Sequence, residues 1–278
     1  MADKNMDNCT HDCSTCSSDC GGSTGPQKEP LNPYSSVDRV FAVMGSKGGT
    51  GKSAVAALLA SQLQNSGIQT AILDADLTGP TIPAAFGLKG RIYADDRGMF
   101  PVESDTGIQI ASVNCLIPRS TDPVLARGAI VENTLKKFWS EMLWEDVRVM
   151  FIDMPSGTGE VPITVLQHLP IDGLIVVTTP QEIATMLAHK TLKTAKALNI
   201  PVVALIENMA TYKCPDCEKE HHIFGASTVK ELAKEFDIRY TAQVPFDTDI
   251  IECMDNGTIE SCDVPIMFNI AARIEELL

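Results

Sequence analysis

The chain has 278 residues, a net charge of -14 at pH 7 and 44% hydrophobic residues, which is typical of a globular protein with one large α/β domain or two small ones. The acidic balance argues against non-specific binding to nucleic acid or to an anionic membrane, since both need a basic face. No apolar run reaches the roughly 18 residues of a membrane span, and the N-terminus has no apolar signal-type stretch, so we expect a cytoplasmic protein.

The first region in chain order, residues 1–38, is rich in Asn, Asp, Ser, Gly and Cys and poor in Leu, Ile and Val. Such a segment cannot bury enough apolar area to offset its chain entropy, so we expect a flexible tail ahead of a folded domain at 39–278. Four of the nine cysteines gather in this tail: Cys9, Cys13, Cys16 and Cys20. Four thiolates suffice for a [4Fe–4S] cluster within a single chain, and a Cys₄ zinc site is the alternative.

From residue 39 onward, short apolar runs alternate with segments of helical spacing. The runs predict buried strands at 39–44, 70–73, 147–152, 173–178 and 202–206. The other segments predict helices at 53–65, 127–140, 183–198, 227–235 and 267–278. Residues 98–113 predict a β-hairpin at the sheet edge. This alternation predicts an α/β fold: a doubly wound, mostly parallel sheet with helices on both faces and a ligand site at the carboxyl ends of the strands.

The loop after the first strand has the composition of a phosphate-binding loop. Its residues are Gly45, Ser46, Lys47, Gly48, Gly49, Thr50, Gly51, Lys52 and Ser53. Glycines let backbone N–H groups turn toward phosphate oxygens, and the following helix adds its positive dipole end. We expect Lys52 to neutralise the β- and γ-phosphates of ATP, and the Ser53 hydroxyl to bind Mg²⁺. Ser46 stands where the usual P-loop of NTPases has its first glycine, which here lies one place earlier, at Gly45.

The string KGGTGKS carries a second lysine, Lys47. It resembles the deviant Walker A motif of the family that contains MinD, ParA and the nitrogenase iron protein. In that family the first lysine reaches the nucleotide site of the partner subunit. The resemblance therefore implies a homodimer in which Lys47 contacts phosphate across the interface and takes part in catalysis.

Carboxylates follow two further predicted strands: Asp74 and Asp76 after 70–73, and Asp153 after 147–152. Carboxylates at strand ends beside a phosphate loop suit Mg²⁺ binding and the positioning of water. We expect Asp153 to hold Mg²⁺ through a water molecule. The resemblance implies that Asp76 orients the attacking water and that Asp74 supports Mg²⁺ from behind.

Five further strings narrow the resemblance: DADLTGPTIP (74–83), FIDMPSGTGEVPIT (151–164), VTTPQEIAT (177–185), ENMATYKCPDC (207–217) and VPFDTDI (244–250). Over about residues 38–278 the chain resembles the Mrp/ApbC family of nucleotide-binding iron–sulfur carriers. That family assembles a [4Fe–4S] cluster, transfers it to apo-proteins, hydrolyses ATP weakly and works as a dimer. The resemblance also implies that Asn208 contacts the adenine edge and that the loop from Pro245 borders the base.

Cys214 and Cys217 form a CxxC motif in the loop after the strand at 202–206. Two thiolates are half of what a [4Fe–4S] cluster requires, so a symmetric dimer would supply the other two and bridge the cluster between its subunits. His221 and His222 follow closely, which leaves a Cys₂His₂ zinc site as the alternative.

The sequence thus predicts an ATP-dependent carrier that takes a cluster from a donor and passes it to apo iron–sulfur proteins. A positioning ATPase of the MinD/ParA type is the second hypothesis. Its membrane form needs a basic amphipathic C-terminal helix, whereas residues 270–278 contain two acids and one base. A reductase like the nitrogenase iron protein is the third, although the cysteines of that protein are not arranged as CxxC.

Overall fold

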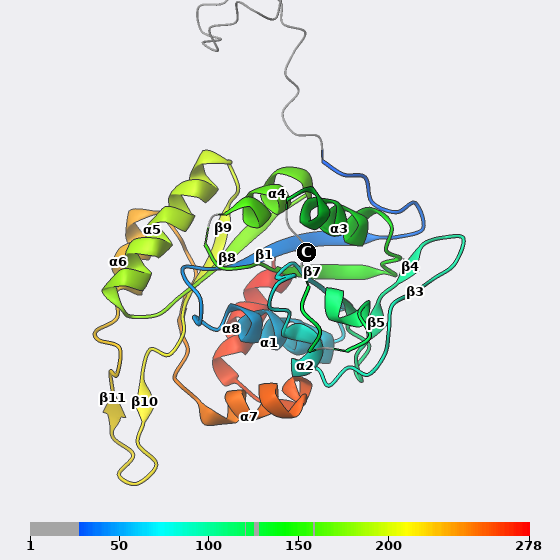
Figure 1. Cartoon of the computed structure of the whole chain (residues 1–278). Helices are drawn as coiled ribbons and strands as arrows, with labels where there is room; N and C mark the ends of the chain where they lie inside the picture. The colour runs from blue at the N-terminus through cyan, green and yellow to red at the C-terminus, as the bar shows by residue number, and fades with distance from the viewer. Residues whose placement is uncertain (1–27, 120, 125–127, 158) are drawn as a thin grey trace, which may run out of the picture.

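The computed structural model describes residues 28–119, 121–124, 128–157 and 159–278 (Figure 1). These residues form an eight-stranded sheet in the order β12-β9-β8-β1-β7-β2-β6-β5. Neighbouring strands are parallel except at one edge, where β5 is antiparallel to β6. The strand bounds are β1 Val37–Gly45, β2 Thr70–Asp74, β5 Val102–Glu103, β6 Gln109–Ala111, β7 Val147–Asp153, β8 Gly173–Thr178, β9 Val202–Glu207 and β12 Thr241–Gln243.

Helices cover both faces of this sheet (Figure 1). One apolar core lies under α3 (Ala129–Ser140), α4 (Glu160–His168), α5 (Glu182–Ala197) and α6 (Val229–Glu235). The other lies under α1 (Lys52–Asn65), α2 (Ile82–Ala85), α7 (Thr248–Asn256) and α8 (Pro265–Glu275). The central strands are buried on both sides, which explains their near-continuous apolar sequences. The predicted doubly wound α/β fold is confirmed.

The edge of the sheet contains the predicted hairpin, since residues 102–103 and 109–111 pair as β5 and β6. A second small pair precedes it, in which β3 (Tyr93–Ala94) is antiparallel to β4 (Met99–Phe100). The sequence patterns did not predict α2, α4 or α7, nor the hairpin of β10 (Tyr212–Lys213) and β11 (Glu220–His221). Two short 3₁₀ turns complete the elements, at Val113–Cys115 and Ile259–Ser261. Within the described ranges, no helix has the combined length and hydropathy of a membrane span.

Residues 28–36 differ from the expectation that they belong to a flexible tail, because they contact the body of the fold. The ammonium of Lys28 donates hydrogen bonds to the carbonyls of Leu166 and Leu169, at 2.9 and 2.6 Å. The indole of Trp139 donates to the Glu29 carbonyl at 2.9 Å, and Asn32 is buried. The folded part of the chain therefore includes residues ahead of β1. These contacts are made by backbone carbonyls, which a composition-based prediction does not register.

Candidate functional site

The phosphate-type loop joins the end of β1 to the start of α1, at the carboxyl end of the sheet. Gly49 and Gly51 have φ values of 77° and 81°, a left-handed conformation that favours glycine. At Gly45 an added Cβ would lie 2.7 Å from the Thr50 hydroxyl, so this position also requires glycine. The hydroxyl of Ser46 lies 3.2 Å from that of Thr178 on β8, which ties the loop to the sheet. The shifted glycine pattern is therefore explained by the tight packing of this turn.

The N-terminus of α1 is built to face an anion. Gly51 precedes the helix and has no side chain to cap its first N–H groups. Lys52 opens the helix with its side chain mostly buried and forms an ion pair with Asp76. Uncapped helical N–H groups and a nearby ammonium together form an anion-binding site.

Two carboxylates lie side by side at the ends of β2 and β7, where Asp74 and Asp153 are in register. Both are fully buried. Asp74 accepts hydrogen bonds from the Ser112 hydroxyl at 2.9 Å and from the backbone N–H of Asp76 at 3.2 Å. Burial and then the charge of Asp153 raise the pKa of Asp74 well above its usual value. The pair therefore concentrates negative charge in a low-dielectric place beside Lys52.

Asp153 differs from Asp74 because no group among the described residues reaches its carboxylate oxygens with normal hydrogen-bond geometry. Burial raises the pKa of Asp153 to about 7, although the Ser53 hydroxyl and the Lys52 ammonium oppose that shift. A buried carboxylate without donors is costly unless a cation accompanies it. Oxygen ligands of this kind are those that Mg²⁺ prefers, so the residues present fit a magnesium ion.

A small apolar cavity of about 180 Å³ opens next to the phosphate-type loop. Asn208 and Pro245, both expected near the base from the family resemblance, line this cavity together. The remaining lining residues are Gly51, Ala54, Met209, Phe246, Asp247, Ile250, Ile251 and Met254. A mostly apolar slot of this size beside a phosphate-type loop suits a planar aromatic base.

Helix α7 supplies the far wall of this cavity and was missed from the sequence. Its boundaries do carry signals: the carboxylate of Asp247 accepts from the N–H of Asp249 at 2.9 Å, and Gly257 ends the helix at φ 72°. None of its residues is fully buried, because its apolar side chains lie between the core and the cavity: Ile250 and Met254 pack against the core and also line the cavity.

Asn208 lies between this cavity and the loop. Its side-chain amide donates to the Thr50 carbonyl at 2.9 Å, and its side-chain oxygen accepts from the Met209 N–H at 3.0 Å. Both polar ends of the side chain are thus engaged within the chain. The expected contact with an adenine edge stays a prediction.

Lys47 contacts its own chain in this structure. Its ammonium donates to the side-chain oxygen of Gln181, the residue that precedes α5. The loop thereby gains a side-chain link to the start of α5. The predicted contact of Lys47 with the nucleotide of a second copy stays a prediction.

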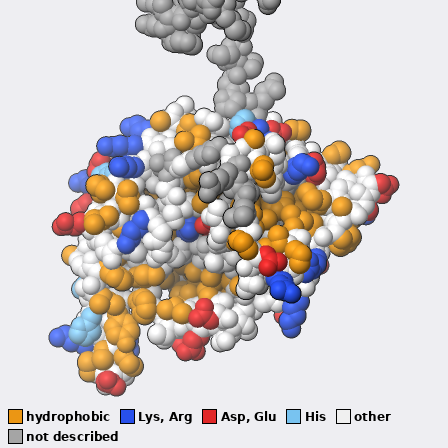
Figure 2. All heavy atoms as spheres, in the orientation of Figure 1, with side chains coloured by type: hydrophobic (Ala, Val, Ile, Leu, Met, Phe, Trp, Pro, Cys, Tyr) orange, Lys and Arg blue, Asp and Glu red, His pale blue; other side chains and the backbone are white. Residues whose placement is uncertain are grey.

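Cys214 and Cys217 lie at the tip of the β10–β11 hairpin, which projects from the body (Figure 1). Figure 2 shows histidine and charged side chains beside hydrophobic ones on this projection. Cys217 is exposed and Cys214 half-buried. The backbone N–H groups of Cys217 and Asp216 lower the pKa of the Cys214 thiol, which favours the thiolate that metals bind.

Within the described part of the chain, no group of three or more His, Cys, Asp and Glu side chains is placed to hold a metal ion. His221 and His222 therefore do not join Cys214 and Cys217 in a four-ligand site of one chain. The zinc alternative at this CxxC stays a prediction. The N-terminal set of Cys9, Cys13, Cys16 and Cys20 lies outside the described residues.

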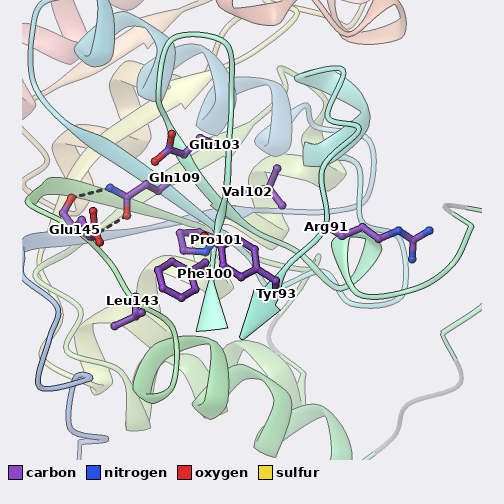
Figure 3. A pocket seen from close by; sticks show the side chains of 9 residues that line it. All are labelled: Arg91, Tyr93, Phe100, Pro101, Val102, Glu103, Gln109, Leu143 and Glu145. Atoms are coloured by element: carbon purple, nitrogen blue, oxygen red, sulfur yellow. Dashed lines mark hydrogen bonds between the residues drawn. The ribbon is translucent and has the colours of Figure 1, made fainter. Parts of the chain in front are cut away.

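A second cavity, of about 430 Å³, lies at the β5 edge of the sheet (Figure 3). The ring of Tyr93 stacks on that of Phe100 at its border, with centroids 4.5 Å apart. Gln109 and the backbone of Glu145 exchange hydrogen bonds of 2.7 and 2.9 Å at its other side. This cavity lies at the sheet edge, whereas the phosphate-type loop follows the central strand β1.

The strand–loop–helix unit and its buried carboxylates define a P-loop nucleoside triphosphatase site. The family model of the ParA: NUBPL iron-transfer P-loop NTPases matches residues 36–275, and the chain belongs to this family. This confirms the resemblance that the motifs indicated.

Individual relatives agree with this assignment. An iron-sulfur cluster carrier protein of Methanococcus maripaludis is 34% identical over 258 residues, which cover 90% of this chain and 89% of the relative. The mouse iron-sulfur cluster transfer protein NUBPL is 35% identical over 84% of this chain and 72% of its own.

Solved structures show the same relationship. A nucleotide-binding protein from Archaeoglobus fulgidus in complex with ADP matches with a TM-score of 0.74 and 34% identity, over 84% of this chain and 91% of that one. The cell division ATPase MinD of Pyrococcus furiosus matches with a TM-score of 0.61 and 16% identity, over 86% and 99%, which shows a shared fold.

Proposed function

We propose that this protein is an ATP-dependent iron–sulfur cluster carrier. It binds a [4Fe–4S] cluster between two copies of the chain and transfers it to apo iron–sulfur proteins after receiving it from a donor. Membership of an iron-transfer P-loop NTPase family and similarity to cluster carrier proteins support this proposal. Neither nucleic acid nor a membrane is needed as a partner, and the expected location is the cytoplasm.

The exposed CxxC hairpin is the observation that carries the proposal. Each chain offers the two thiols of Cys214 and Cys217, and the described residues provide no third ligand for them. A four-thiolate cluster is completed when the hairpins of two copies meet. A cluster held at exposed tips is accessible to an acceptor protein, as transfer requires. The cluster is thus cargo and not a buried catalytic group.

The nucleotide site provides the energy source. The loop from Gly45 to Ser53 cradles the phosphates of ATP, with Lys52 as the main cation. Ser53 and, through water, Asp153 would hold Mg²⁺, which would neutralise part of the phosphate charge. Asp74 supports the Mg²⁺ site without binding the ion directly. Asp76 orients the water that attacks the γ-phosphate. The expected activity is a weak ATPase activity.

Nucleotide state controls the dimer in this proposal. Lys47 leaves Gln181 and reaches the phosphates of the other copy, which favours a closed dimer while the γ-phosphate is present. Hydrolysis removes that contact and relaxes the grip of the two hairpins on the cluster.

The four N-terminal cysteines form a second metal site in the tail, ahead of the P-loop domain. Their spacing of three, two and three intervening residues allows a [4Fe–4S] cluster within one chain. A zinc ion on four thiolates is the alternative.

The proposal is tested by anaerobic purification and reconstitution, with iron, sulfide and zinc measured per chain. We expect four iron and four sulfide per dimer at the CxxC site. Dimer formation should depend on the cluster, and the loaded protein should restore activity to an apo iron–sulfur enzyme. A zinc-loaded chain with no iron, or a loaded dimer that never transfers its cluster, would contradict it.

A further inference from the structure

The stretch of chain that lines one part of the base-sized cavity also leads into the cysteine hairpin. Asn208 and Met209 follow β9, whereas Pro245 and Phe246 follow β12, and both segments line the cavity. The first segment continues directly into β10 and then to Cys214. Whatever displaces the cavity wall therefore acts on the chain that carries the cysteines.

Backbone hydrogen bonds tie the two segments together. The N–H of Ala210 donates to the Val244 carbonyl at 2.9 Å, and the N–H of Phe246 donates to the Thr211 carbonyl at 2.7 Å. The segment after β9 and the segment after β12 are thus paired like two short strands, and we expect them to shift together. This pairing ends one residue before Tyr212, the first residue of β10.

An aromatic contact extends this pairing into the hairpin. The ring of Phe246, which lines the cavity, meets the ring of Tyr212 edge to face, with centroids 6.0 Å apart and an angle of 73°. Tyr212 lies two residues before Cys214. A base that fills the cavity must pack against Phe246 or displace it, and a packed ring passes such a shift to its neighbour.

Glu207 fixes the two ends of the segment that carries the hairpin. It is fully buried at the end of β9, and its carboxylate accepts from the Thr228 N–H at 3.2 Å and from the Gln243 side chain at 2.9 Å. Thr228 precedes α6, where the chain returns from the hairpin. Both ends of segment 208–228 are therefore fixed to the sheet edge. A shift of Phe246 then moves the hairpin relative to a fixed base.

We infer that the Phe246–Tyr212 ring pair couples the cavity to the cysteine hairpin, so that a nucleoside base, not phosphate alone, sets the position of Cys214. The inference rests on the proposed function and specifies its regulation. Phe246 and Tyr212 are positioning residues, because they bind neither the cluster nor the phosphates and act by placing the hairpin that carries Cys214. Coupling between two binding sites is reciprocal, so the cluster must change nucleotide affinity by the factor by which nucleotide changes cluster affinity.

The first experiment measures the Kd for ADP of the full chain with and without its cluster. An aromatic pair of this kind corresponds to a difference of about two- to tenfold between the two forms. Tyr212→Ala should bring this ratio to about one, whereas its iron content and its ADP affinity without cluster stay at the wild-type values. Tyr212→Phe keeps the ring and should restore the ratio. Tyr93→Ala, which removes the matched ring pair in the β3–β4 hairpin, should leave it unchanged.

Inorganic pyrophosphate separates base from phosphate, because it presents the two phosphates of ADP to the loop, leaves the cavity empty and carries no γ-phosphate for Lys47 of a second copy. Its affinity should be the same with and without cluster. An equal ratio for ADP and pyrophosphate would place the coupling in the phosphate loop and overturn the inference. A wild-type ADP ratio of one would overturn it as well, while leaving cluster binding and transfer intact.

A second readout needs no cluster. ADP should slow amide hydrogen exchange at Cys214, whose N–H donates to the Lys219 carbonyl at 3.0 Å, and at Glu218, whose N–H donates back to Cys214 at 2.9 Å. Tyr212→Ala should abolish the slowing, and Tyr212→Phe should keep it. Equal slowing in Tyr212→Ala refutes the coupling. A chain that binds no iron but shows the expected exchange pattern refutes the carrier function alone.

Discussion

The ammonium of Lys52 lies 3.9 Å from a carboxylate oxygen of Asp76, and both side chains are mostly buried. In the chain without nucleotide, Asp76 is thus the counter-ion of the lysine that the phosphate loop presents. An incoming phosphate carries more negative charge and competes for the same ammonium. Its arrival frees Asp76, which can then accept a hydrogen bond from water.

Lys52→Ala should weaken ATP binding about 10- to 100-fold, because the phosphates lose their charged donor. Nucleotide titration calorimetry measures the change. Lys52→Met keeps most of the buried stem and should bind as poorly as the alanine variant, which separates charge from packing. Wild-type affinity in either variant would show that the loop does not bind phosphate through this residue.

Lys47→Ala should keep ATP binding within about threefold and lose most hydrolysis, because in the proposed dimer this lysine acts on the other copy. The wild-type rate per chain should rise with protein concentration as dimers form. Gln181→Ala is the matched control, since it only removes the partner that holds Lys47 in the single chain. Equal rates per chain in monomer and dimer would rule out a role across the interface.

The sheet could be predicted from the sequence because its central strands are buried on both faces. Strands such as β7 and β8 are almost continuously apolar, and helical spacing between the runs placed five of the helices. The phosphate-type loop was equally clear, since its glycines and lysine form one short motif between a strand and a helix. In the structure a Cβ at Gly45 or Gly51 would clash, and Gly49 and Gly51 have positive φ. These features depend on local sequence.

Only part of the lining of the base cavity could be predicted, because it comes from segments that are far apart in the sequence. Asn208 and Pro245 were found by resemblance, whereas α7 is only nine residues long and none of its apolar residues is fully buried. The partners of Lys47 and Glu207 were likewise hidden, since Gln181 and Thr228 have no pattern of their own. Contacts across long sequence separations depend on topology, which periodicity does not reveal.

Asp153→Asn should stabilise the nucleotide-free chain at pH 7.5 by about 1 kcal/mol, because it removes a buried carboxylate that lacks donors. It should also lower the magnesium dependence of ATP binding. Thermal melting with and without Mg²⁺ and ATP measures both effects. Asp74→Asn is the contrast: Asp74 accepts two hydrogen bonds, so its replacement should destabilise the chain. The same destabilisation in both variants would contradict the cation site.

Cys214→Ala or Cys217→Ala should abolish the proposed bridging cluster and weaken the dimer, because in that proposal each hairpin supplies two of the four ligands. Iron analysis and size-exclusion chromatography under anaerobic conditions measure the two effects. Cys253→Ala and Cys262→Ala remove half-buried thiols outside the hairpin and should retain full loading. Full iron content at the hairpin of a single-cysteine variant would sink the shared-cluster hypothesis.

Deleting residues 1–25 should remove one set of iron and sulfide and leave ATP binding and the Cys214/Cys217 site intact. The deleted segment holds Cys9, Cys13, Cys16 and Cys20 but few apolar residues, so the domain should fold without it. Metal analysis and thermal melting of full-length and truncated protein make the comparison. Equal iron content would reject a cluster in the tail, and loss of zinc in place of iron would favour the zinc site.

A longer deletion, of residues 1–36, provides the structural control. It removes the hydrogen bonds of Lys28 to the carbonyls of Leu166 and Leu169 and that of Trp139 to Glu29. The loss of several such bonds should lower the free energy of unfolding by about 2–4 kcal/mol, whereas the deletion to residue 25 should change it little. A large fall in the melting temperature after the shorter deletion would show that the cysteine segment itself stabilises the domain. The step in stability should therefore occur between residues 25 and 36, where the described contacts begin.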